Sequence, residues 1–382
     1  DRYGVGKDLR WAVAARNEQK LATLRESLGS PATSLPVIVA DTLDAESMRQ
    51  LAKRTRVVLT TVGPYARYGS QLVAACAENG THYCDLAGEV QWIRRMIDAH
   101  DATARQSGAR IVHCCGFDSI PMDIGAWFLQ QESQQRYGAY CDSIVLLVKA
   151  MKGGASGGTM ASIMNVMREA RADKEVARVL ARPYSLNPEG ELRGPDRGDQ
   201  RAIRFDDEAG SWTAPFIMAT VNTRVVRRSH ALLGYPWGDS FRYHEAIQTG
   251  SGVGGWSRSA MITAGLTGLV GAASFGWSRG LLERFVLPRP GTGPGAAARE
   301  KGFFNLEQIG RLADGRTIRS RITGDRDPGY GSTSKMLAES AVCLAMDDLD
   351  SGGGVLTPAA AMAAPLLQRL RANAGLSFEI RD

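Results

Sequence analysis

The chain has 382 residues, of which 44% are hydrophobic and 23% are charged, as expected for a folded globular protein with room for two domains. Its net charge is +6, but the basic residues are scattered and mostly Arg, which argues against a nucleic-acid-binding protein. The six cysteines, at positions 76, 84, 114, 115, 141 and 343, show neither a C-x-x-C pair nor a metal-ligand spacing, so the sequence predicts no metal site and no disulfide framework, in keeping with a reducing cytosol.

The first predicted elements lie in the segment 9–21, LRWAVAARNEQKL, which resembles the second strand and next helix of a nucleotide-binding fold. Such a fold places a first strand and a phosphate-binding glycine loop ahead of this segment. Only DRYGVGKD precedes it here, which leaves no room for them. Either these elements belong to a longer protein, or the fold lacks them and its cofactor site is incomplete.

The first third of the chain alternates strand-like and helix-like segments. Asp44 is placed to cap one helix at its start, and Gly80 closes another at its end. This alternation predicts an α/β fold with a Rossmann-type parallel sheet, whose ligands bind at the carboxyl ends of the strands. The predicted strands are 36–41, 56–64, 82–88 and 109–116, and the predicted helices are 44–54, 70–80 and a helix that ends at Gly108.

Arg16 and Asn17 follow the strand WAVAA, where a dinucleotide-binding fold meets the adenosine ribose. An Arg at this position can pair with a 2′-phosphate, which favours NADP over NAD. Asp41 ends the next strand, where its carboxylate could accept from the adenine amino group. The alternatives are a solvated surface Arg and a capping or turn role for Asp41.

The stretch 60–69, TTVGPYARYG, predicts a tight turn at the end of a strand. Val62 and Gly63 are predicted to let the backbone approach the cofactor, and Pro64 fixes the turn. Tyr65 is then expected beside the nicotinamide. The alternative is an ordinary Gly-Pro turn with solvent-facing tyrosines.

The last strand of this part runs into CGFDSIPMD at 115–123, and Gly116 is assigned to the cofactor site. Asp118 or Ser119 can cap the helix that follows, and its free N–H groups would also suit an anionic or carbonyl-bearing ligand. Capping alone would explain both residues equally well. Cys114 and Cys115 are expected to be small buried side chains rather than a redox pair.

Beyond about residue 135 the pattern changes to an α+β domain with a mostly antiparallel sheet. A helix led by glycines is predicted from SGGTMASIMNVMREA, and the segment 183–200, rich in Pro, Gly and charge, is predicted to be a mobile loop. The predicted strands are 142–151, 201–207, 215–221, 241–249 and 316–323.

The segment 259–278 carries no charged residue and contains glycines at every third position from Gly265 to Gly271. A helix of this length would cover roughly 30 Å. Three interpretations remain open: a buried or interface helix, a segment at the membrane surface, and a true membrane span.

Two stretches together carry a family resemblance: TTVGPYARYGSQLVAACAENGTHYCDLAGE and RIVHCCGFDSIPMD. They resemble the saccharopine dehydrogenase-like oxidoreductases, and within these the actinobacterial trans-acting enoyl reductases. SGGT at 156–159 and the segments 326–345 and 353–370 extend the resemblance over the whole chain. It implies a strand, a glycine loop and a helix ahead of Asp1, roughly twenty residues that would cradle the cofactor pyrophosphate.

The expected domain organisation follows from the patterns and the resemblance together. Residues 1–135 form an NADP-binding Rossmann-like domain that lacks its first strand, and 331–382 join it, including the C-terminal helices and the strand GLSFEI. Residues 136–330 form a second domain, which in this family supplies the wall that faces the substrate and often a homodimer contact.

The resemblance implies an NADPH-dependent enoyl reductase that acts on a polyketide or lipid acyl chain, presented by a synthase, in glycolipid biosynthesis. Such an enzyme needs a donor that stabilises the enolate and protonates the α-carbon. Tyr65 is the first choice, followed by Tyr68 and by Asp118 and Ser119. The expected location is the cytoplasm, with peripheral contact at the plasma membrane.

Two other functions remain open. The first is reduction of an amino-acid-like imine, whose carboxylates would require Arg side chains such as Arg224, Arg227 and Arg228, although these could simply form a solvated face. The second is a membrane-associated binding or scaffold protein without turnover. Fold alone does not decide among them.

Overall fold

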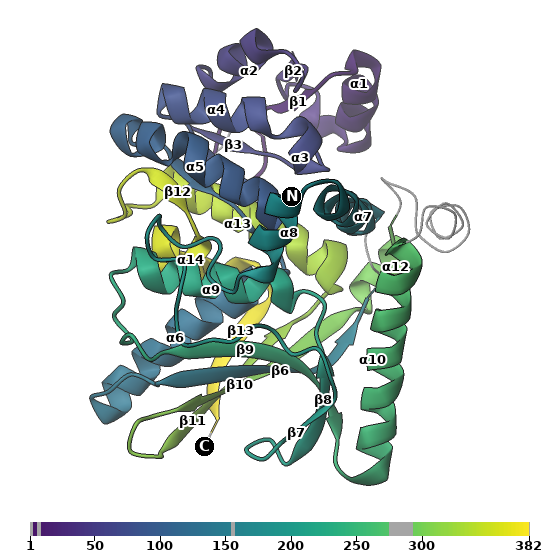
Figure 1. The fold of residues 1–382 in the computed structure, drawn as a ribbon. Helices are drawn as coiled ribbons and strands as arrows, with labels where there is room; N and C mark the ends of the chain where they lie inside the picture. The colour runs from purple at the N-terminus through teal and green to yellow at the C-terminus, as the bar shows by residue number, and fades with distance from the viewer. Residues whose placement is uncertain (1–2, 6–8, 154–156, 275–292, 382) are drawn as a thin grey trace.

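The structure is a computed structural model, and it describes residues 3–5, 9–153, 157–274 and 293–381. The four-stranded and the seven-stranded sheets lie on either side of a layer of helices, with the first part of the chain above and the larger sheet below in Figure 1. The predicted α/β class, with a parallel sheet and a second, mostly antiparallel sheet, is confirmed.

The first sheet is parallel throughout and has the strand order β12-β5-β4-β3. Its strands are β3 (Val57–Leu59), β4 (His82–Cys84), β5 (Arg110–Val112) and β12 (Gly354–Leu356). Strands β1 (Val13–Ala15) and β2 (Val37–Val39) form a separate parallel pair, with Val13 opposite Val37. Each of these strands lies within a segment that the sequence predicts to be a strand, except β12.

Helices α4 and α5 cover one face of this sheet. The Asp44 side chain accepts from the N–H of Glu46 at the start of α2, and Gly80 ends α4 at φ 69°, so both predicted caps are confirmed. The helices of this part are α1 (Glu18–Ser27), η1 (Ser30–Ala32), α2 (Ala45–Ala52), α3 (Tyr65–Tyr68), α4 (Ser70–Asn79) and α5 (Val90–Ser107).

The second sheet has the order β13-β11-β10-β6-β9-β8-β7, and every pair is antiparallel except β6 with β9. Its strands are β6 (Ser143–Lys152), β7 (Arg204–Asp206), β8 (Ser211–Pro215), β9 (Arg242–Gly250), β10 (Phe303–Arg311), β11 (Thr317–Gly324) and β13 (Leu376–Arg381).

Two strand predictions are wrong here. The segment 215–221 leaves the sheet after Pro215 and enters helix α9 (Ala219–Leu232), because a short apolar run does not distinguish a strand from the start of a buried helix. The strand GLSFEI does not return to the first sheet: as β13 it pairs with β11 at the edge of the second.

Some of the remaining helices form the layer between the two larger sheets. Helices α6, α9 and α14 pack on the second sheet, while α13 and α14 also contact strands of the first. Their bounds, and those of the other helices, are α6 (Ile120–Tyr137), α7 (Gly157–Ala172), α8 (Lys174–Ala181), α10 (Gly252–Ser274), α12 (Ala296–Glu300), the π-helical turn η2 (Pro328–Ser332), α13 (Thr333–Met346) and α14 (Pro358–Asn373).

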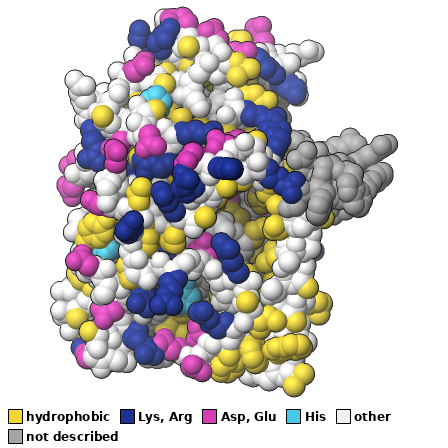
Figure 2. All heavy atoms as spheres, in the orientation of Figure 1, with side chains coloured by type: hydrophobic (Ala, Val, Ile, Leu, Met, Phe, Trp, Pro, Cys, Tyr) yellow, Lys and Arg dark blue, Asp and Glu magenta, His cyan; other side chains and the backbone are white. Residues whose placement is uncertain are grey.

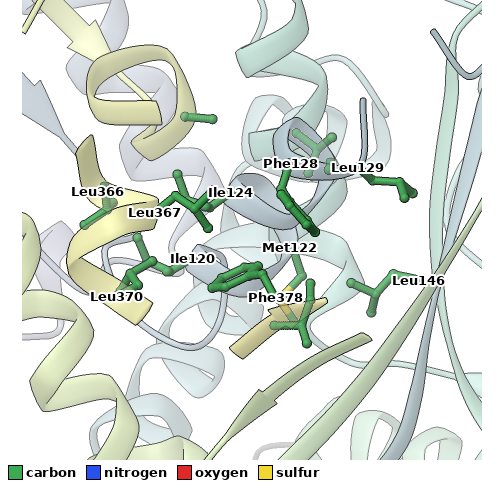
Figure 3. Close-up of a cluster of buried hydrophobic side chains, with 14 of the residues drawn as sticks. Ile120, Met122, Ile124, Phe128, Leu129, Leu146, Leu366, Leu367, Leu370 and Phe378 are labelled. Atoms are coloured by element: carbon green, nitrogen blue, oxygen red, sulfur yellow. The ribbon is translucent and has the colours of Figure 1, made fainter. Parts of the chain in front are cut away.

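The main core is built around α6. Figure 3 shows side chains of α6, such as Ile124 and Phe128, between Leu367 of α14 and Phe378 of β13. Because α6 begins directly after the loop that follows β5, this packing fixes the position of that loop, where the site residues lie.

Helix α10 contains the described part of the uncharged segment, since 275–278 fall outside the described residues. One side of α10 packs on β8 and β9, and the other side leaves apolar groups exposed, with Val253 at 84% and Met261 at 71%. None of the helices in the described ranges is long and apolar enough to cross a bilayer.

Candidate functional site

The loops at the carboxyl ends of β3, β4 and β5 form the centre of the candidate site. Val62 and Gly63, after β3, are exposed. The helix α3 that begins after Pro64 is one turn long and continues directly into α4.

Tyr65 points into this scaffold rather than out of it. Its side chain is 5% exposed, its ring stacks on Trp92 at 5.5 Å, and its hydroxyl donates to the Thr60 carbonyl oxygen at 3.2 Å. The same hydroxyl accepts from the Leu86 N–H at 3.2 Å. Burial raises the pKa of the Tyr65 hydroxyl well above its usual range. In this geometry Tyr65 fastens the β3 loop to the β4 loop and offers no free proton.

Asp85 is a buried hub that the sequence analysis missed. It accepts from the Tyr83 hydroxyl at 2.9 Å, from His113 Nδ1 at 2.7 Å and from the N–H groups of Ala87 and Cys114 at 3.0 and 3.1 Å. Four donors satisfy its carboxylate oxygens, and they lock the β4 and β5 loops together. Cys114 holds a left-handed backbone, with φ 65°, in this arrangement.

Glu89 is the second missed carboxylate. It accepts from the N–H groups of Tyr65 and Ala66 at 2.6 and 3.2 Å, and from the Ser162 hydroxyl at 3.0 Å. Burial raises its pKa despite these donors. Since Ser162 lies on α7, Glu89 joins the β4 loop to an element of the second half of the fold.

The loop after β5 carries the remaining predicted residues. Gly116 is buried, and a Cβ there would lie 2.7 Å from the Leu86 side chain, so it permits close packing rather than lining an open surface. Asp118 is half-buried, and burial raises the pKa of its carboxyl to about 6. The next N–H group toward β5, that of Phe117, donates to the Thr333 hydroxyl at 3.0 Å.

Ser119 stands at the N-cap position of α6 but does not cap it with its side chain. Its hydroxyl donates to Asn222 Oδ1 at 3.2 Å, and Asn222 Nδ2 donates to Glu245 Oε2 at 2.9 Å. Glu245 also accepts from the Tyr243 hydroxyl, and burial raises its pKa to about 8. The expectation that Ser119 caps the helix is therefore wrong: it anchors α6 to the second sheet.

The adenosine-side residues lie at one edge of the β1–β2 pair, as their parallel register requires. Arg16 is exposed, and within the described part of the chain no carboxylate pairs with it. Asn17 caps α1 by accepting from the Lys20 N–H at 2.9 Å. Asp41 accepts from the Leu43 N–H with one carboxylate oxygen, which matches the predicted turn role.

The three arginines of α9 are buried and engaged. Arg224 pairs with Asp199 at 3.0 Å and Arg227 with Asp196 at 2.6 Å, while Arg228 donates to the carbonyl oxygens of Leu186 and Val355. They are neither a solvated face nor a free anion site. Three of these partners, Leu186, Asp196 and Asp199, lie in the segment 183–200, so buried ion pairs and a hydrogen bond hold the predicted loop against α9.

The free cysteines Cys114 and Cys115 are buried, and burial raises the pKa of both thiols, which confirms small buried side chains over a redox pair. Among the described residues there is no group of His, Cys, Asp and Glu arranged to hold a metal ion. Figure 2 shows the surface hollowed between the two halves of the molecule, on the side of α10.

Comparisons with known proteins add the following. Residues 4–112 match the saccharopine dehydrogenase NADP binding domain. A Mycobacterium tuberculosis protein, provisionally named as a trans-acting enoyl reductase, is 44% identical over 98% of this chain and 92% of its own length. A Mycobacterium ulcerans trans-acting enoyl reductase is 38% identical over 94% of this chain and 89% of its own.

Among solved structures, apo saccharopine dehydrogenase (L-Glu forming) from Saccharomyces cerevisiae superposes with a TM-score of 0.53. It covers 98% of this chain and 95% of that chain at 12% identity, which is a likeness of fold.

Proposed function

The chain belongs to the family of the trans-acting enoyl reductases, whose first domain is the NADP-binding domain of saccharopine dehydrogenase, and from this membership we propose that it reduces an activated C=C bond of a polyketide or lipid acyl chain. It is an NADP-dependent oxidoreductase, and the predicted family, enzyme class and cofactor are confirmed.

The residues at the first-domain edge fit NADP. Arg16 presents an exposed guanidinium that no carboxylate neutralises within the described ranges, which is the donor that a 2′-phosphate requires. Asn17 and Asp41 stand beside it, and the exposed backbone of Val62 and Gly63 is available along the β3 loop. We assign these residues, with Pro64 fixing the loop, to the cofactor site.

NADPH, when bound, supplies the hydride, and the chain must supply the proton that completes reduction of the double bond. Asp118 is the best candidate for that role, because its carboxyl is half-buried in the loop after β5 and burial raises its pKa to about 6, which favours the protonated form. Ser119 and Gly116 act indirectly in this proposal: they hold the loop that presents Asp118. The hydrogen bonds of Tyr65 support a role in positioning rather than as a donor.

The proposal extends to the surroundings of the enzyme. The acyl chain is presented by a synthase in glycolipid biosynthesis, and the protein works in the cytoplasm with peripheral contact at the plasma membrane and as a homodimer. The observation that supports a contact surface is α10, whose outer side exposes Val253, Trp256 and Met261. Vesicle flotation and light scattering test the membrane contact and the dimer separately.

The single observation that carries the reaction is the placement of Asp118 at the end of β5 with its raised pKa. The test is steady-state oxidation of NADPH with a crotonyl thioester, comparing the wild type with Asp118→Asn. We expect the variant to lose about 100-fold in kcat, the usual contribution of a general acid. Asp207→Asn is the matched control, because Asp207 is exposed and lies in the turn after β7.

The alternatives give different outcomes in the same assay. Oxidation of NADPH with a 2-oxo acid and an amine, but not with enoyl thioesters, would favour imine reduction. The engagement of Arg224, Arg227 and Arg228 within the protein argues against it, since they are not free to bind substrate carboxylates. Failure to bind NADPH at all would favour the scaffold.

A further inference from the structure

A pocket on the second half of the molecule is not used by the reaction proposed above. It has a volume of about 440 Å³ and is formed where the end of β6 meets α12. Its lining residues are Lys152, Gly153, Pro294, Ala297, Ala298 and Lys301. The size is that of a pocket for a small organic ligand.

The two lysines give the pocket an uncompensated positive charge. In the described part of the chain, no carboxylate pairs with Lys152 or Lys301. Neither acidic neighbour forms an ion pair with these lysines in the described ranges: Glu300 pairs with Arg326 at 3.3 Å, and the Asp327 oxygens accept from the N–H groups of Tyr330 and Gly331. An anionic group would therefore be attracted to this position.

The rest of the lining is apolar and small. Pro294, Ala297 and Ala298 contribute no charge and no side-chain hydrogen-bonding group, so they suit the uncharged part of a ligand. The ligand that matches is amphipathic, with an anionic group at the lysines and an extended, weakly polar arm along the alanines.

The pocket is connected to the loop of Asp118 through a short series of contacts. Gly153 lies against Pro328, since a Cβ there would be 2.7 Å from the Pro328 ring. The Pro328 carbonyl accepts from the Thr333 hydroxyl at 2.7 Å, and that hydroxyl accepts from the Phe117 N–H. The β6 end, the turn η2 and the Asp118 loop are thus adjacent, and a ligand held by the lysines can extend toward Asp118.

We propose that this pocket binds the phosphate of a phosphopantetheine arm, with Lys152 and Lys301 as its ligands, and so directs the acyl thioester on that arm toward Asp118. The inference rests on the proposed function, because an enoyl thioester is the substrate that would carry such an arm. Coenzyme A and the prosthetic group of a carrier protein share this chemistry. Two lysines on separate elements can contact one phosphate from two sides.

The first test measures binding, which needs no turnover. Calorimetric titration of the full chain, with NADP present to occupy its own site, compares 4′-phosphopantetheine with pantetheine, which lacks the phosphate. We expect the phosphate to tighten binding about tenfold in the wild type, about 1.4 kcal/mol. The Lys152→Gln/Lys301→Gln variant should bind both probes equally. Lys149→Gln is the control, because Lys149 is on the same strand but pairs with Glu307.

The second test identifies the source of the arm and separates the two proposals. KM for crotonyl-coenzyme A and for a crotonyl carrier protein is compared between the wild type and the double-lysine variant, with the crotonyl thioester of N-acetylcysteamine as the substrate without phosphate. A rise in KM for one or both phosphate-bearing substrates, but not for the short thioester, supports the inference and assigns the source. Unchanged KM values with turnover intact, or equal binding of the two probes by the wild type, would overturn it. A phosphate preference in binding without any enoyl reduction would support the phosphate pocket and contradict the proposed reaction.

Discussion

At the scale of single residues, the candidate site is organised by buried carboxylates that accept hydrogen bonds from neighbouring side chains and backbone N–H groups. Asp85 and Glu89 each satisfy their oxygens with neighbouring donors, and this is what joins the loops after β3, β4 and β5. Glu245 likewise accepts hydrogen bonds, from Tyr243 and from Asn222, which in turn contacts Ser119. The only half-buried carboxyl among the predicted donors is Asp118.

Asp118 gives a prediction about pH. Its acid form is required for proton donation, and its pKa is raised to about 6 by burial. We therefore expect kcat to be highest below pH 6 and to fall as the pH rises through that value, and Asp118→Asn should abolish this limb of the profile. A kcat that rises across the same range would assign the titrating group to another residue.

Arg16 gives a prediction about cofactor choice. Arg16→Ala should reduce the preference for NADPH over NADH by about tenfold, or about 1.4 kcal/mol, because the guanidinium has no other partner in the described ranges. Fluorescence titration with each cofactor measures this preference. Arg204→Ala is the control, since Arg204 is also exposed and lies on β7 in the second sheet. An unchanged preference would return Arg16 to the class of solvated surface residues.

Glu245 gives a prediction about stability. Its folded pKa of about 8 lies above the ordinary value of 4.5, so its burial is least costly below pH 4.5 and stability is lost as the pH rises toward 8. Glu245→Gln should remove roughly 4 kcal/mol of the difference in unfolding free energy between pH 5 and pH 9. Urea denaturation at the two values measures it, with the exposed Glu379→Gln as the control. An identical pH dependence in both variants would contradict the assignment.

At the scale of elements, the strands and helices of the first part could be predicted from periodicity and caps, since Asp44 and Gly80 act locally. The orientation of Tyr65 could not, because it depends on Trp92, which lies one strand and one helix further along the chain. The segment DLAGE contained one usable signal: Asp85 directly follows a strand, and Glu89 comes four residues later. The start of α9 was missed because PFIMATV suits a strand and a buried helix equally.

The segment 183–200 shows the same limit and gives a prediction of its own. Its composition indicates a loop, but Asp196 and Asp199 are paired with arginines that lie on α9. Asp196→Asn leaves the buried Arg227 without its charge partner, and we expect a loss of about 3 kcal/mol in unfolding free energy. Trypsin should then cleave faster at the exposed Arg193 and Arg197. Equal cleavage rates in the wild type and variant would show that other contacts hold the segment.

At the scale of the whole molecule, the two sheets share one layer of helices. Helix α14 contacts strands of both, and the core around α6 includes residues from each half. The expected domains were 1–135 with 331–382, and 136–330. Because the core is continuous between them, we propose this division for function and not for independent folding. A chain boundary cannot be read from sequence where the core is continuous across it.

The separate β1–β2 pair should exchange its amide protons with solvent faster than the first sheet beside it. The β1–β2 pair is hydrogen-bonded to neither β3 nor any other strand among the described residues, and Val39 is 56% exposed. A ladder of two short strands is marginal in water by itself, so it opens at a lower free energy than the sheet beside it. The N–H groups of β1 and β2 should become deuterated well before those of β4 and β5. Filling the adjoining proposed cofactor site with NADP should slow that exchange, because a ligand that touches Arg16 and Asp41 stabilises the two strands that precede these residues.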